Sequence, residues 1–221
     1  MSRSLVLAAL AAAVLAAGAF WATRPTTPPA FSLAAEAQEA TAEQIAMVPD
    51  MALGAADAPV TVIEYASFTC PHCATFHKDV WPRLKADYVD AGKVRFVHRE
   101  VYFDRYGLWA AMIARCGGGT ERYFGIADMI YDGQKDWIGD GQANTVAGNL
   151  RRLGLAAGIG EDALEACLND AEMAQAMVAT YQKHATEHGI DSTPTLVIDG
   201  ESHSNMSYNQ LRDLLDARLG N

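Results

Sequence analysis

The sequence predicts an α/β protein in which a helical insertion interrupts a small sheet-forming region. A β-α-β pattern runs through residues 60–99, helical patterns dominate residues 104–189, and a strand-like segment returns at 195–199. The chain has 221 residues, and 50% of them are hydrophobic against 20% charged. A chain of this composition can bury a core, which excludes disorder along its whole length.

The first strand is predicted at residues 60–66, which are rich in β-branched side chains. Apolar residues at helical spacing predict a helix over 70–89, and Pro82 should kink it. A second strand is predicted at 93–99. Strand, helix and strand in this order indicate a parallel pair joined by a crossover helix.

The middle of the chain, residues 104–189, shows helical spacing broken at glycines, and we expect four or five helices there. The strand at 195–199 is followed by an Asp-Gly turn and a short strand near 201–205. A final amphipathic helix begins at Ser207, which with Gln210 fits a capping box. We therefore expect a sheet domain formed by 59–103 and 190–221, with 104–189 inserted into it.

The N-terminus predicts targeting across a membrane. Arg3 precedes an uncharged apolar run over residues 5–22, so residues 1–24 fit either a cleaved signal peptide or an uncleaved anchor. Residues 25–58 are expected to form a linker, and 32–47 within it are compatible with a short helix. Both interpretations deliver the rest of the chain to a compartment where disulfides persist.

Charge and cysteine content limit the possible functions. Lys and Arg total 17 against 27 for Asp and Glu, which gives a net charge of −10 and no electrostatic basis for nucleic-acid binding. The four cysteines are too few for a disulfide-built scaffold but allow two pairs.

The motif Cys70-Pro71-His72-Cys73 lies between the first strand and its helix. Cys70 is expected at the helix N-terminus, where unpaired N–H groups favour the thiolate, and Pro71 suits the first helical position. A protonated His72 would add a second stabilising charge. Cys73, one turn further in, is expected to be less exposed and to act as the resolving thiol.

Two other interpretations of this motif are weaker. Half of a zinc site needs a second ligand pair, and no other C-x-x-C or C-x-x-H exists in the chain. A purely structural bridge over so short a loop gains little entropy. The motif therefore predicts a redox-active pair that needs no metal and no other cofactor.

The segment VIEYASFTCPHC, ending at Cys73, together with Ser192-Thr193-Pro194-Thr195, resembles the DsbA family of periplasmic thiol-disulfide oxidoreductases. The resemblance covers roughly residues 51–219. It implies a thioredoxin fold interrupted by the helical insertion, a cis bond before Pro194, and a role for that proline in holding extended substrate.

The resemblance also implies roles for neighbouring residues. Glu64 is expected to exchange a proton with Cys73, the alternative being a glutamate that points outward from its strand. Independently of the resemblance, Phe68 lies just before the exposed turn and is a candidate for a groove that binds unfolded substrates, the alternative being a core position. The best-known strong oxidant of the family has valine where this chain has Thr193, so the direction of electron flow stays open.

The remaining cysteines, Cys116 and Cys167, lie in the helical insertion. We expect a structural disulfide between them, as is known in some DsbA-like proteins. Two separate buried thiols are the alternative.

The function expected from these features is donation of the Cys70–Cys73 disulfide to reduced or unfolded secreted proteins. The resemblance implies a membrane quinone-linked thiol oxidase as the partner that reoxidises the pair. It also implies a periplasmic location, with the protein either soluble or tethered by residues 5–22. Action as a disulfide isomerase or reductase is the main alternative, and a chaperone-like binding module is a further one.

Overall fold

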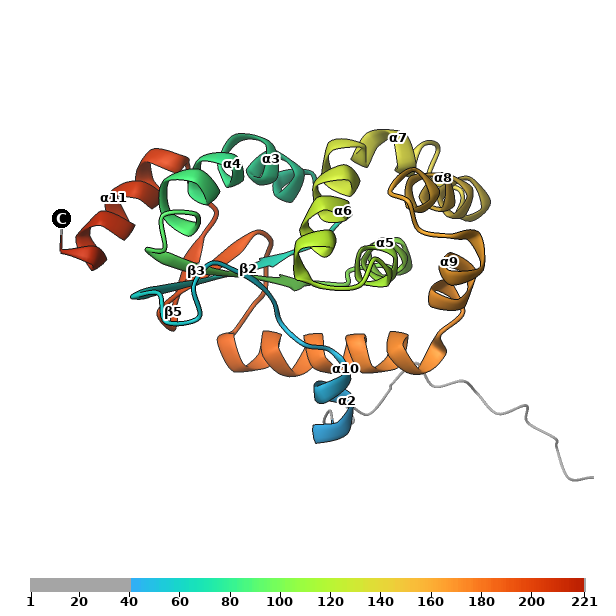
Figure 1. Ribbon diagram of the computed structural model, residues 1–221, viewed down its shortest axis with the longest axis horizontal. Coiled ribbons are helices and arrows are strands. Elements are labelled where there is room, and N and C mark those ends of the chain that lie inside the picture. Colours follow the sequence, from blue (N-terminus) through green and yellow to red (C-terminus); the bar gives the residue numbers. More distant parts are fainter. Residues whose placement is uncertain (1–40, 221) are drawn as a thin grey trace, which may run out of the picture. The chain divides into compact units, whose positions relative to one another are not determined.

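A mixed five-stranded sheet in the order β1-β3-β2-β4-β5 forms the centre of the fold (Figure 1). The strands are β1 (Met51–Leu53), β2 (Val60–Ala66), β3 (Val94–Glu100), β4 (Thr195–Ile198) and β5 (Glu201–Ser204). Strands β2 and β3 run parallel, and the other neighbours are antiparallel. This computed structural model describes residues 41–220, and the expectations for 1–24 and 25–40 lie outside them.

Helices cover both faces of the sheet (Figure 1). Alternation along β2 places Val62 and Ala66 in the main hydrophobic core, which also contains the helices that follow this strand. Ile63 and Tyr65 face the other way and belong to a smaller cluster with Tyr181 of α10 (Ala171–His188). Glu64 therefore lies on the same face as the helix that carries the cysteine motif.

The helix expected over 70–89 is divided into α3 (Pro71–Asp79), α4 (Trp81–Leu84) and a π-helical turn, η1 (Lys85–Val89). The prediction of one continuous helix kinked at Pro82 was wrong, because the helix is interrupted before that residue. Pro82 lies in the first turn of α4, where its missing N–H costs no intrahelical hydrogen bond, so the chain breaks before the proline.

The insertion expected at 104–189 is helical throughout. Its helices are α5 (Arg105–Cys116), α6 (Thr120–Asp132), α7 (Gln134–Ile138), α8 (Ala143–Ala156), α9 (Glu161–Leu168) and α10. The short α7 was not predicted, because five residues give too few turns for a periodic pattern. The main hydrophobic core extends without a break from the sheet into α5, α6 and α8. The structure thus confirms an α/β sheet fold interrupted by a helical insertion.

The segment expected to be a linker contributes to the fold. Helix α2 (Ala42–Met47) packs against α10, and β1 adds an antiparallel strand at the edge of the sheet beside β3. The short helix expected within 32–47 is thus present from residue 42, whereas a linker running on to residue 58 was wrong. Strand β1 was missed because three residues are too short to show strand alternation in the sequence. Within residues 41–220, none of the helices combines the length and apolar character that a membrane span requires.

The C-terminal elements follow the sequence closely. Asp199 and Gly200 both have positive φ, 49° and 88°, as a tight hairpin turn between β4 and β5 requires. The capping box of Ser207 and Gln210 is present at the start of α11 (Tyr208–Leu219). These local signals fix the last helix against the face that also carries α4.

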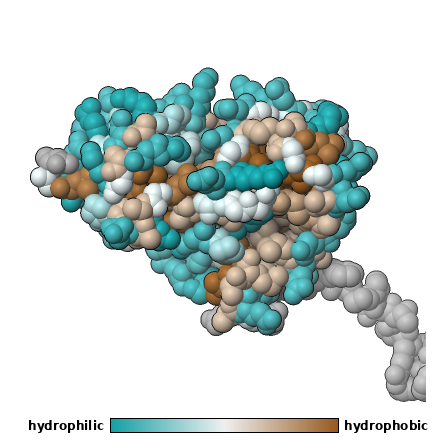
Figure 2. Space-filling view, viewed as in Figure 1, coloured by the Kyte–Doolittle hydropathy of each residue, from teal (hydrophilic) through white to brown (hydrophobic). Residues whose placement is uncertain are grey.

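The face of the molecule seen in Figure 2 is mostly polar. Figure 2 shows hydrophilic residues over most of one face, with small apolar patches between them. The exposed large apolar side chains include Phe103, which is 58% exposed, Met129 and Leu155.

A disulfide joins Cys116, the last residue of α5, to Cys167 in α9, with Cα atoms 5.9 Å apart. It closes a sequence separation of 51 residues. A cross-link of this span restricts the unfolded chain and leaves the native packing in place.

Removing this disulfide should destabilise the insertion. For a Cys116→Ala/Cys167→Ala variant we expect a loss of about 2–4 kcal/mol in the free energy of unfolding, because the unfolded chain regains loop entropy. Urea unfolding followed by circular dichroism measures this loss. An unchanged urea midpoint would show that the disulfide does not restrict the unfolded chain.

Candidate active site

Cys70 and Cys73 lie at the start of α3, directly after the strand that forms the middle of the sheet. Cys70 is the N-cap residue, with extended backbone angles (φ −81°, ψ 119°), and Pro71 occupies the first turn. Both cysteines are free thiols, Cys70 being half-buried and Cys73 buried. The pair thus has one sulfur that a partner thiol can reach and one that it cannot.

The two thiols have opposite acidities. A hydrogen bond from Cys73, together with the backbone N–H groups of Cys73 and His72, lowers the pKa of Cys70 to about 5, although its partial burial opposes this. Burial raises the pKa of Cys73 well above its ordinary value, and the charge of Glu64 raises it further. At neutral pH Cys70 is therefore a thiolate and Cys73 a thiol.

The Thr193-Pro194 segment faces Cys70 from the other side. Its peptide bond is cis, and the Cys70 sulfur lies 3.5 Å from the Thr193 carbonyl oxygen, to which the thiol form can donate. Pro194 is buried, while Thr193 is half-buried. The Thr193 hydroxyl is itself buried and has no hydrogen-bond partner within residues 41–220.

The other residues singled out near the motif divide into two groups. Pro71 and His72 are exposed on the first turn of α3, next to Cys70. Phe68 is only 1% exposed and packs against the ring of Tyr131, with ring centroids 4.8 Å apart. The expectation that Phe68 contributes to a substrate groove was wrong, because helix α6 of the insertion covers it.

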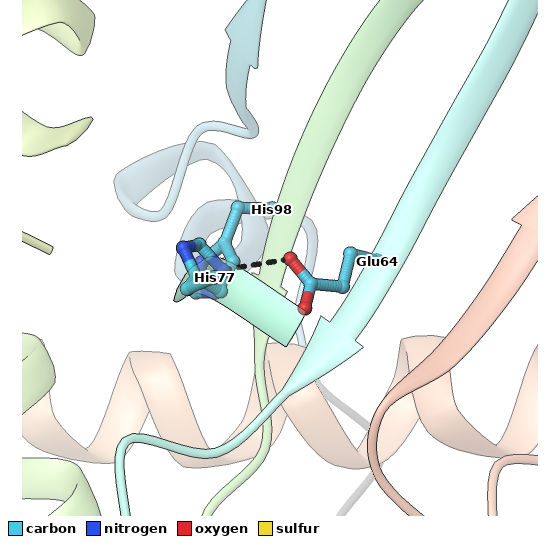
Figure 3. A group of neighbouring side chains, drawn as sticks. All are labelled: Glu64, His77 and His98. Atoms are coloured by element: carbon cyan, nitrogen blue, oxygen red, sulfur yellow. Dashed lines mark hydrogen bonds and ion pairs between the residues drawn. The ribbon is translucent and has the colours of Figure 1, made fainter. Parts of the chain in front are cut away.

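Glu64 points into the core beneath the cysteine motif. It is fully buried, so the outward-facing alternative is wrong. Its Oε2 lies 3.0 Å from Nε2 of His77, which comes from α3 (Figure 3). The other oxygen, Oε1, is buried without a hydrogen-bond partner in the described part of the chain.

His77 was not predicted as a functional residue. Burial lowers its pKa, but the charge of Glu64 and the nearby Asp128 carboxylate outweigh this and raise it to about 9. The ring stacks on Tyr131, with centroids 4.0 Å apart. The sequence held one signal for it, since Cys73 and His77 are four residues apart and so share a helix face.

His98 completes this buried group. It is the cross-strand partner of Glu64, and burial lowers the pKa of its ring to about 4. Nδ1 lies 2.6 Å from the Tyr123 hydroxyl, and Nε2 lies 3.1 Å from that of Tyr131.

Glu64, His77 and His98 offer ligand atoms within 4.8 Å of one another, a spacing that a metal ion can bridge. Both nitrogens of His98 and Nε2 of His77 are, however, engaged by tyrosine or carboxylate groups. The arrangement is that of a hydrogen-bonded network.

The insertion holds the active-site loop in place. The Gln134 side-chain amide at the start of α7 donates to the carbonyls of Phe68 at 2.8 Å and of Cys70 at 3.0 Å. Thr69 donates to Asp104, the N-cap residue of α5, at 2.8 Å. No sequence signal connected Gln134 to the motif, since the two are 64 residues apart in the chain.

Comparisons with known proteins agree with this geometry. The family model described as Thioredoxin matches residues 46–217. A Rickettsia bellii protein, provisionally named a protein-disulfide oxidoreductase, is 29% identical over 170 residues, which cover 77% of this chain and 64% of that protein. This chain thus spans less than two thirds of the length of that relative.

Solved structures of disulfide-exchange proteins also resemble this chain. The crystal structure of alpha-DsbA1 from Wolbachia pipientis has a TM-score of 0.71 at 28% identity, covering 78% of this chain and 92% of that one. Oxidised BdbD from Bacillus subtilis has a TM-score of 0.68 at 24% identity and covers 78% and 94%. The latter likeness is one of fold alone.

The reduced protein should contain one thiolate at neutral pH. Titration by thiolate absorbance should give a pKa of about 5 for Cys70 and no further transition from Cys73 in the ordinary thiol range. An unfolded chain keeps the Cys70 proton to about pH 8.5. Between about pH 5 and about pH 8.5, unfolding therefore takes up a proton at Cys70. The free energy of unfolding of the reduced form should rise with pH across this range.

A Cys70→Ala variant is the control for that titration, since it should remove the low transition. An ordinary thiol pKa at Cys70, near 8.5, would contradict the hydrogen-bonding described above.

Gln134 should be needed for a stable active-site loop. We expect Gln134→Leu to cost about 1–3 kcal/mol in the free energy of unfolding, because the Phe68 and Cys70 carbonyls lose their donor. Gln182→Leu, at an exposed position on α10, is the matched control and should change little. Equal urea midpoints for the two variants would refute this role.

Proposed function

Because the chain belongs to the thioredoxin family, as a DsbA-like member of it, we propose that it is a protein-disulfide oxidoreductase that donates the Cys70–Cys73 disulfide to secreted proteins during folding. The observation that carries this proposal is the difference in acidity between the two thiols. A stabilised Cys70 thiolate favours the dithiol form, which makes the disulfide form oxidising.

The reaction proceeds through a mixed disulfide at Cys70. A substrate thiolate attacks the Cys70 sulfur, the Cys70–Cys73 bond breaks, and its electron pair goes to Cys73. The high pKa of Cys73 requires a proton at that sulfur, and Glu64 is the nearby acid-base group proposed to supply it. A second substrate thiolate then attacks the substrate sulfur of the mixed disulfide, and Cys70 leaves as a thiolate.

The remaining site residues have proposed supporting roles. Thr193 and Pro194 face Cys70 and would hold an extended substrate segment against it. Pro71 and His72 are exposed beside the reactive sulfur and would contact the same segment. A substrate-facing role for Phe68 is not retained, because its side chain is buried.

We further propose that the protein works in the periplasm and that a membrane quinone-linked thiol oxidase reoxidises it. A soluble form after signal cleavage and a form tethered by residues 5–22 are both compatible with this location. The family resemblance and the apolar N-terminal run in the sequence support these points.

Isomerase or reductase action is the second candidate function. It is favoured by one observation, the threonine before the cis proline, whose buried hydroxyl lacks a partner in the described residues. A hydroxyl next to Cys70 can donate to the thiolate and change the rate at which mixed disulfides are released.

The reduction potential of the Cys70–Cys73 pair tests the proposal. Equilibration with glutathione should give a value near roughly −120 mV, the range of a strong disulfide donor. Because reduction adds two electrons but only one proton above the pKa of Cys70, the potential should fall by about 30 mV per pH unit near neutrality. A value of roughly −200 mV or lower would favour the isomerase or reductase function instead.

Two variants test the roles of Cys70 and Cys73 in disulfide exchange. Cys73→Ala should accumulate a mixed disulfide with a disulfide-containing substrate protein, because the Cys70 thiolate attacks that disulfide, one substrate thiol leaves, and Cys73 is no longer there to release the substrate. Cys70→Ala should abolish exchange. Retained activity of Cys70→Ala would show a binding module in which the cysteines are incidental.

A further inference from the structure

We propose that His77 and Asp128 form a proton route between solvent and the buried Glu64–Cys73 side of the active site. This inference rests on the proposed function, because a route of this kind matters only if Cys73 alternates between disulfide and thiol. The steps of disulfide exchange give the buried His77 imidazole no role, and the proton route would give it one.

The geometry forms a chain from the core to the surface. Glu64 Oε2 lies 3.0 Å from His77 Nε2, and His77 Nδ1 on the other side of the ring lies 3.8 Å from Asp128 Oδ1. The side chains of Glu64 and His77 are 0% and 2% exposed, whereas that of Asp128 is 49% exposed. The ring therefore connects a fully buried carboxylate to one that exchanges protons with water.

Two atoms of the Glu64 and His77 side chains are free to take part. Glu64 Oε1 and His77 Nδ1 are buried and lack hydrogen-bond partners among residues 41–220. The distance of 3.8 Å is that of an ion pair and is longer than a hydrogen bond, so proton transfer requires the half-exposed Asp128 side chain to move closer to the ring. Figure 3 shows His77 from α3 beside the Glu64 carboxylate and close to His98.

The groups around His77 explain why it carries the proton. Glu64 from β2 and Asp128 from α6 are the carboxylates that face it and raise its pKa to about 9. Tyr131 of α6 stacks on the ring and His98 of β3 lies at its edge, with centroids 5.6 Å apart.

His98 is a poor competitor for that proton. Burial keeps its pKa near 4, and the charges of Glu100 and Arg115 act on it with opposite signs. Protons in this part of the core are therefore held by the Glu64–His77 pair.

Opening the disulfide requires one proton at Cys73. When substrate thiolate opens the disulfide, Cys73 leaves with the electron pair and takes one proton from the Glu64–His77 pair. His77 is then reprotonated through Asp128 by one of the two protons that the substrate thiols have released to solvent. Substrate loses two thiol protons overall, so one net proton is released to solvent while the Cys70 thiolate stays unprotonated.

Asp128→Asn tests the route, because a half-exposed carboxylate can be replaced without opening the core. The oxidised variant is reduced by dithiothreitol between about pH 6 and about pH 9, and samples are quenched by alkylation. We expect a rate about three- to tenfold lower than wild type toward the alkaline end, a fraction of what a positioned acid contributes. Asp132→Asn, an exposed position at the end of the same helix, is the control and should match wild type.

Two readouts separate a proton route from a structural effect. Small protonated buffers such as imidazolium should restore the rate of Asp128→Asn in proportion to their concentration. The solvent deuterium isotope effect on reduction should be larger in this variant than in Asp132→Asn. His77→Gln provides a second variant and should slow the reaction more, without rescue, because buffer does not reach the core.

The outcomes distinguish the two levels of the proposal. A wild-type protein whose Cys70–Cys73 disulfide does not exchange with dithiothreitol in this assay would overturn the proposed function itself. An active wild type with equal rates, isotope effects and buffer responses in Asp128→Asn and Asp132→Asn would overturn the proton route and leave the oxidoreductase function intact.

Discussion

The position of Cys70 at the start of α3 is the constraint on which the rest of the site depends. Its backbone is still extended while the next residue begins the helix, so the sulfur lies at the helix N-terminus with the N–H groups of the first turn around it. The same turn places Cys73 inside the core, where a charge is costly. One local geometry thus produces a stable thiolate and, three residues later, a thiol that resists ionisation.

The insertion is part of the active site as well as a cover for the core. Gln134 and Asp104 hold the loop on which Cys70 lies, and both come from the beginnings of insertion helices. These contacts bury the carbonyl groups of the loop and keep them paired, which the low dielectric of the interior demands. The precision of the sulfur's position therefore depends on packing between two regions that are distant in the sequence.

This dependence also explains what could be predicted from the sequence. The strand before the motif, the helix after it and the C-terminal hairpin carry local signals, and the structure has each of them. The failures at Phe68 and Gln134 share one cause, since both depend on where the insertion packs. His77 was missed for another reason: its helix face was predictable, but its partner Asp128 comes from α6, and helical spacing says nothing about which helices meet.

The buried Glu64–His77 pair then has a chemical meaning beyond stability. Burying two charges costs desolvation energy that their attraction repays only in good geometry, so a pair of this kind is weak evidence for a stabilising role. Here burial raises the pKa of Cys73 and the carboxylate charge raises it further, so that sulfur must take a proton when the disulfide opens. A site that makes a proton necessary in a closed core must also admit one. In the described residues, the imidazole between Glu64 and the half-exposed Asp128 joins that core to solvent.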